Sequence, residues 1–143
     1  MSLDKVLSIS GKPGLYKLIA QTRGGFVAES LIDNKRISVS VQSNVSVLSE
    51  IAIYTLTEEV PLKQVFQNIK KKENGNETSI KSNDSKDKLE EYFFDVLPNY
   101  DEDRVYASDI KKVMQWYNLL QKHNMLDLLD IEDEKVNSID EEE

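Results

Sequence analysis

The block from Leu7 to Val41 constrains the fold more than any other part of the chain. It reads LSISGKPGLYKLIAQTRGGFVAESLIDNKRISVSV, a series of short alternating apolar runs separated by Gly-Lys-Pro-Gly, Gly-Gly and Asp-Asn. Such alternation is typical of strands with one buried face, and glycine and asparagine pairs favour tight turns between them. The block therefore predicts a small antiparallel β unit, and it carries no recognisable catalytic motif.

Three strands are expected within this block, over residues 14–21, 26–31 and 37–41. Residues 45–48 suggest a helical turn, and residues 51–56 suggest a further strand. Four or five short strands are too few for a sandwich. The pattern predicts a small barrel-like or strongly curved sheet.

Helical patterns follow the strands. Pro61 suits the first turn of a helix over residues 61–72, whose apolar stripe is expected to pack on the sheet. Further helices are expected at Leu89–Val96, at 109–123 with Ser108 as the N-cap, and at 124–129.

The predicted fold class is α+β, with a small N-terminal antiparallel β-barrel-like domain and its packed helix, followed by a small α-helical C-terminal domain. The first domain covers residues 1–72 and the second covers residues 87–130. Between them, residues 73–86 are rich in Asn, Ser, Lys and acidic residues, a composition that predicts a flexible linker. Residues 131–143 are expected to be a disordered acidic tail.

Charge is unevenly distributed along the chain, whose formal net charge is −8. Residues 1–60 hold six basic and six acidic side chains, residues 61–90 hold seven and five, and residues 91–143 hold five and fifteen. The last part would therefore be repelled by a phosphate backbone. The absence of cysteine excludes disulfides and thiolate metal sites. No secretory signal or membrane-length apolar run is visible, so we expect a cytoplasmic protein with no membrane partner.

Motifs for catalysis and cofactor binding are weak. The Gly-Lys-Pro-Gly segment at residues 11–14 lacks the spacing of a phosphate-binding loop, and the turn between two strands is the better interpretation. His123 is the single histidine and cannot build a usual zinc site. The acidic clusters around Asp101 and Asp127 lack the pattern of a calcium loop and are interpreted as solvated faces. We therefore expect no catalytic, cofactor-binding or metal-ligating residues, and no enzyme activity.

Two surfaces are candidates for recognition. The apolar arc of the 109–123 helix covers more than half its circumference, and a helical unit of about 40 residues is difficult to stabilise alone. One stripe of this helix is therefore a candidate protein interface, formed by Trp116, Leu119, Leu120 and His123. The alternative is a nucleic-acid-binding face on the β unit, formed by Lys12, Tyr16, Lys17, Arg23, Lys35 and Arg36.

Three segments resemble a family of small uncharacterised Bacteroidetes proteins: LSISGKPGLYKLI, SLIDNKRI and FFDVLPNYDEDRVYASDIKKVMQWYNLL. The resemblance covers about residues 3–70 and 86–125. It implies an N-terminal domain of unknown function joined by a variable linker to a helical C-terminal domain. It implies no activity, substrate or cofactor, so it supplies no functional residues.

The function expected from these observations is a non-catalytic interaction or adaptor module that contacts a protein partner or a second copy of the chain. Two alternatives remain open. One is a nucleic-acid-associated protein that uses the basic turns of the β unit. The other is an enzyme with an unrecognised site built from carboxylates and lysines.

Overall fold

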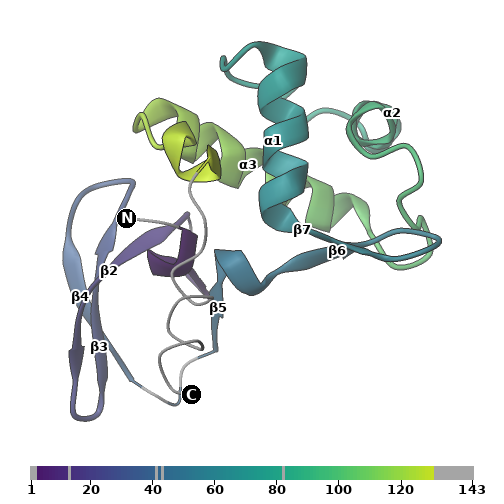
Figure 1. Ribbon diagram of the computed structural model, residues 1–143. Coiled ribbons are helices and arrows are strands. Elements are labelled where there is room, and N and C mark those ends of the chain that lie inside the picture. The colour runs from purple at the N-terminus through teal and green to yellow at the C-terminus, as the bar shows by residue number, and fades with distance from the viewer. Residues whose placement is uncertain (1–2, 13, 41, 43, 82, 131–143) are drawn as a thin grey trace.

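A five-stranded antiparallel sheet forms the N-terminal part of the protein, which is shown as a computed structural model in Figure 1. The structure describes residues 3–12, 14–40, 42, 44–81 and 83–130. A 3₁₀ turn, η1 (Leu3–Lys5), precedes the sheet. The strands lie in the order β4-β3-β2-β1-β5 and are β1 (Val6–Ile9), β2 (Tyr16–Thr22), β3 (Gly25–Ser30), β4 (Arg36–Ser40) and β5 (Val45–Val47).

The predicted α+β class is confirmed, whereas "barrel-like" describes the sheet only loosely. Strands β4 and β5 stand at opposite ends of the strand order, and the sheet is not closed. Because side chains alternate along each strand, the register divides the sheet into two faces. Leu7 lies opposite both Tyr16 and Val47, and Phe26 lies opposite Val39, so these residues share the apolar face.

Residues 45–48 were predicted to form a helical turn, and this prediction is wrong for the first three of them. Val45 and Val47 alternate with Ser46 and pair with β1 as strand β5. The 3₁₀ turn η2 follows over Leu48–Glu50. β-Branched residues favour a pleated surface, and the distant β1 strand supplies the pairing that a local pattern does not reveal.

The predicted strand at residues 51–56 forms a separate hairpin. Strand β6 (Ala52–Tyr54) pairs antiparallel with β7 (Glu59–Pro61), and this pair is not joined to the large sheet. Thr55 closes the turn because its backbone N–H donates to the Glu58 carbonyl at 2.8 Å and its hydroxyl accepts the Glu58 N–H at 2.9 Å.

Three α-helices follow the hairpin. They are α1 (Leu62–Glu73), α2 (Lys86–Val96) and α3 (Ala107–Lys122), and the 3₁₀ turn η3 (Leu126–Asp130) comes after them. The predicted N-cap at Ser108 is wrong, since α3 begins one residue after Tyr106. The Asp109 carboxylate accepts the Tyr106 N–H at 3.0 Å, so the helix start is stabilised from inside its first turn.

The N-terminal part and the helices share one buried cluster, and the apolar face of the sheet forms a second, smaller one. Leu3, Leu15 and Leu31 from the N-terminal part belong to the same buried cluster as the inward stripes of α1 and α3. Helix α1 packs against α2, α3, β6 and both 3₁₀ turns η2 and η3. In Figure 1 the helices gather above and to the right of the sheet, and α1 crosses in front of α3. The two parts of the chain are therefore packed on each other.

The segment predicted as a flexible linker is anchored to the helices over residues 76–80. Thr78 is buried with 9% of its surface exposed. Asn118 on α3 accepts the Thr78 N–H at 2.9 Å and donates to the Thr78 hydroxyl at 3.0 Å. Tyr117 donates its hydroxyl proton to the Asn76 carbonyl at 2.8 Å, and Ile80 packs against the core. The predicted division at residues 72 and 87 stays a prediction, and the predicted acidic tail lies outside the described residues.

Candidate functional site

A groove lies between strand β6 and helix α3. Its volume is about 250 Å³, and its walls include Ala52 and Tyr54 from β6 and Val113 and Trp116 from α3. The β6–β7 hairpin holds the β6 wall in place, and the buried stripe of α3 holds the α3 wall. Val113, Met114 and Tyr117 are buried, so the neighbouring Trp116 is held at the edge of the core.

The β6 edge that faces away from β7 is only partly paired. The Ile51 carbonyl accepts the Leu62 N–H, and Thr55 bonds to Glu58, so odd-numbered residues of the strand point their backbone groups toward β7. The even-numbered residues point theirs outward, because the direction of these groups alternates along a strand. On this outer edge, Asn99 accepts from Leu56 and Asp101 donates to Tyr54, both at 2.9 Å.

The outer edge is open beyond this single bridge. No hydrogen bond joins the N–H and C=O of Ala52, or the N–H of Tyr54, to any other residue that the structure describes. Ala52 and Tyr54 line the groove, so these free backbone groups border it. An unpaired strand edge of this kind is a template for another extended chain.

The rim of the groove is mainly basic. The Arg104 guanidinium lies 5.1 Å from the ring centre of Tyr54 and 3.6 Å from the Asp101 carboxylate. Lys112 is exposed on α3 and forms no ion pair with another described residue. Asp109 is the acidic lining residue, and one of its oxygens accepts the Tyr106 N–H. The arrangement therefore offers two cations, one apolar wall and free backbone groups.

The structure divides the predicted protein-interface residues among different environments. Trp116 is half-buried in the groove. Leu119 lines a different hollow of about 460 Å³ beside Gly14 and Ile32. Leu120 is fully buried, so its assignment to an interface is wrong and it is a core residue. His123 is half-buried at the end of α3, where its N–H donates to the Leu119 carbonyl.

The predicted nucleic-acid-binding residues do not form one basic aromatic face. Tyr16 is 7% exposed and packs in the apolar face of the sheet, so it cannot stack on a base. Lys17 and Arg36 lie on the opposite face, where both pair with Glu29, at 3.4 and 3.1 Å. The hydrogen bond from Arg36 lowers the pKa of Glu29 below its usual value, and Lys17 adds to this effect.

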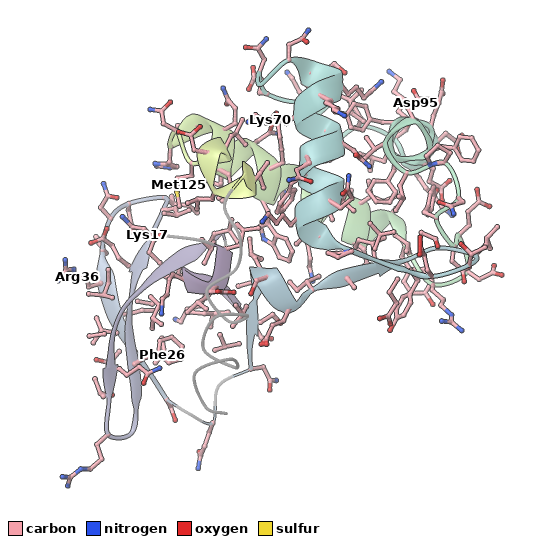
Figure 2. The ribbon with its side chains drawn as sticks, viewed as in Figure 1. Lys17, Phe26, Arg36, Lys70, Asp95 and Met125 are labelled. Atoms are coloured by element: carbon pink, nitrogen blue, oxygen red, sulfur yellow. The ribbon has the colours of Figure 1, made fainter. Side chains whose placement is uncertain are left out.

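Figure 2 shows the separation of the two faces, with Arg36 on the outer side of the sheet and Phe26 on its inner side. Lys12, Arg23 and Lys35 are exposed at the ends of the strands. None of the three lines the groove between β6 and α3.

The most strongly perturbed titratable groups are structural. The Tyr92 hydroxyl donates to the Glu73 carboxylate at 2.5 Å, and burial together with this bond raises the pKa of Tyr92 well above its usual value. Burial, with a smaller effect from Glu73, raises the pKa of Tyr117 to about 12. Tyr92 connects α2 to the last residue of α1, and Tyr117 connects α3 to the segment after α1. Neither lines the groove between β6 and α3.

The described residues contain no group of three or more His, Cys, Asp and Glu side chains arranged to hold a metal ion. They also include no helix that is long and apolar enough to cross a membrane. The groove between β6 and α3 is therefore the candidate functional site, since it combines the predicted Trp116 with backbone groups that the sequence analysis missed. Strand β6 itself was predicted, but its free edge depends on a pairing pattern that a single sequence does not display.

Comparisons with known proteins identify relatives but no activity. Residues 3–48 match a domain of unknown function, DUF5606, and residues 51–120 match a second one, DUF6852. The two matches meet at η2, so α1 falls in the second. No match to a curated protein is found.

A solution NMR structure of a protein from Bacteroides vulgatus, a structural genomics target, is 47% identical to this chain with a TM-score of 0.72. The match covers 86% of this chain and 88% of that protein. The expected resemblance is thereby confirmed. This chain belongs to the family of uncharacterised Bacteroidetes proteins that join a DUF5606 domain to a DUF6852 domain.

Proposed function

We propose that this protein is a non-catalytic interaction module of the cytoplasm that binds a protein partner through the groove between β6 and α3. The observation that carries the proposal is the open edge of β6 beside the half-buried Trp116. Tryptophan supplies a large apolar contact with one polar donor, a combination that is enriched at the centre of protein interfaces. A partner that covers the groove removes apolar surface from water and completes the hydrogen bonding of the strand edge.

The groove favours protein recognition over the two alternatives. Nucleic-acid binding needs accessible cations beside exposed aromatic rings, whereas Glu29 pairs with Lys17 and Arg36, and Tyr16 is buried on the other face. Catalysis needs a nucleophile or an acid–base pair that converges on a substrate. The groove presents an indole, aliphatic side chains and backbone groups, and two of its charged lining residues are already engaged, Arg104 with Asp101 and Asp109 with the Tyr106 N–H, an arrangement that suits binding.

The proposal is tested with a photo-crosslinking side chain placed at position 112, on the groove rim, in a Bacteroidetes host. The matched control places the same side chain at Lys71, which is also an exposed helical lysine but lies by a different hollow on α1. We expect a covalent adduct from position 112 that is absent from position 71 and is lost when Trp116→Ala is added. An adduct of twice the chain mass identifies the partner as a second copy, and light scattering on the purified protein then gives a dimer.

Equal crosslinking from both positions, or none from position 112, contradicts the proposal. Circular dichroism of the Trp116→Ala protein shows whether the fold is retained, so that loss of the adduct is assigned to the groove. The Trp116→Phe protein serves the same purpose with a smaller change in volume, and it is expected to retain part of the adduct.

A further inference from the structure

We propose that the groove binds an extended peptide segment of the partner, which adds to the open edge of β6 as a new strand. The segment carries an apolar residue with a carboxylate side chain close to it in sequence. This inference rests on the proposed function, because it specifies how the same groove recognises its partner. It follows from the pairing of β6, from the size of the groove and from the charges on its rim.

The outer edge of β6 has free backbone groups that could pair with a third strand beside β6 and β7. The antiparallel bridge between Thr55 and Tyr100 places the segment 99–101 against the outer edge of β6. This segment leaves the edge after Asp101, which is the residue that bonds to Tyr54. The free groups of Ala52 and the free N–H of Tyr54 continue the same line of donors and acceptors. An incoming strand would extend the pairing that residues 99–101 begin.

The size of the groove fits a passing segment better than an enclosed small molecule. Its volume of about 250 Å³ is smaller than the range of about 300–1,000 Å³ that is usual for small-molecule pockets. Val113 and Trp116 form the wall opposite the strand edge, so one side chain of an added strand would pack against them. Peptides that add to a sheet edge obtain affinity from main-chain hydrogen bonds and specificity from such side-chain contacts.

The rim charges select an acidic segment. Lys112 has no ion-pair partner among the described residues, and Arg104 keeps its planar group over the Tyr54 ring at the other end of the wall. Asp109 is the opposing charge, and its contact with the Tyr106 N–H directs one oxygen into the start of α3. A carboxylate on the peptide therefore meets Lys112, since Arg104 is already paired with Asp101 at 3.6 Å.

Ala52→Pro is the sharpest test of strand addition. Proline removes the outward N–H of residue 52 and leaves the β6–β7 hydrogen bonds in place, because residue 52 does not donate toward β7. The preceding residue Ile51 has φ −83° and ψ 138°, the extended conformation that a residue before proline prefers. Glu59→Pro is the matched control, since Glu59 lies opposite Tyr54 in the register and its N–H points to the outer edge of β7.

The experiment selects peptides from a random nine-residue phage-displayed library on the full chain and measures the Kd of dye-labelled synthetic peptides by fluorescence anisotropy, which also applies to the Trp116→Ala protein. We expect the selected peptides to pair an aliphatic residue with Asp or Glu. We expect Ala52→Pro to raise their Kd about tenfold, the effect of one lost hydrogen bond, and Glu59→Pro to leave it within about twofold. Lys112→Glu should raise the Kd of acidic peptides by several-fold. Amide hydrogen exchange at Ala52 and Tyr54 should slow when peptide is bound.

Two results overturn strand addition while leaving the proposed function intact. One is a set of peptides whose affinity falls with Trp116→Ala but not with Ala52→Pro, since such peptides lie in the groove without pairing. The other is a library that gives no binder although position 112 crosslinks to a partner. Failure of both the library and the crosslinking contradicts the proposed function as well. Thermal unfolding of each proline variant confirms that the hairpin is intact before affinities are compared.

Discussion

Asn118→Ala tests whether residues 76–80 are a structural part of the fold or a flexible connection. Asn118 makes two hydrogen bonds with Thr78, at 2.9 and 3.0 Å. Each such bond contributes about 1 kcal/mol, and a buried N–H left without a partner costs about 1–3 kcal/mol. Thr78 is 9% exposed, so water reaches its N–H poorly after the substitution. We expect the free energy of unfolding to fall by about 2–3 kcal/mol.

Urea unfolding followed by circular dichroism measures this loss. With a slope of about 1–3 kcal/mol per molar urea, the midpoint should fall by about 1 M while the slope is unchanged. Asn83→Ala is the matched control, because Asn83 is an exposed amide between α1 and α2 without a hydrogen bond to another described residue. It should change stability by less than about 0.5 kcal/mol. If Asn118→Ala lowers the free energy of unfolding by no more than the control does, residues 76–80 are not anchored and the flexible-linker interpretation is correct.

Three further substitutions test other parts of the fold. Leu120→Ala should destabilise the protein by about 3–5 kcal/mol, because this fully buried side chain leaves a cavity in the core; a loss below about 1 kcal/mol by urea unfolding would place it at the surface. Gly25→Ala should destabilise the protein by about 1–3 kcal/mol or more, because the added Cβ would lie 1.8 Å from the Val39 carbonyl oxygen. An unchanged melting temperature would disprove this close approach. The Tyr117 pKa is raised to about 12, so its contribution to stability is complete below its unfolded pKa of about 10 and is lost as the pH rises from about 10 to 12. Tyr117→Phe should therefore show a shallower loss of stability over this alkaline range, and equal slopes in the two proteins would contradict the shift.

The alternating residues of the sheet were sufficient to predict β2, β3 and β4 to within two residues at each end. In each of these strands one face is apolar and the turns contain Gly or Asn, so the local pattern and the final environment agree. Strand β5 was missed because its three residues, Val45–Val47, are too few to show a period. Their partner is β1, which lies almost forty positions earlier in the sequence. Pairing over such a separation is a property of the folded chain and not of the segment.

The polar composition of residues 73–86 led to the linker prediction for a similar reason. The hydrophobic pattern indicates how much apolar surface a segment can bury, and Ile80 is the large apolar residue of residues 73–86. The structure holds it by hydrogen bonds between Thr78 and Asn118 and between Asn76 and Tyr117, which are separated by 40 and 41 positions. Such bonds leave no periodic signal in a single sequence. The groove was missed for the same reason, because Ala52 and Trp116 are far apart in the sequence and come together only in the folded chain.

The residues of the groove and the N-terminal sheet lie in different parts of the chain. All of its lining residues lie between positions 51 and 116, inside the second family match, and the N-terminal sheet contributes none. The N-terminal part contributes instead to the shared cluster, where Leu3, Leu15 and Leu31 are buried together with α1 and α3. Substitutions at these leucines should therefore weaken partner binding only through loss of stability, whereas Trp116 and Lys112 act on binding directly. A stability measurement beside each binding measurement distinguishes the two effects, and a leucine variant of unchanged stability that loses the partner would show that the sheet takes part in recognition.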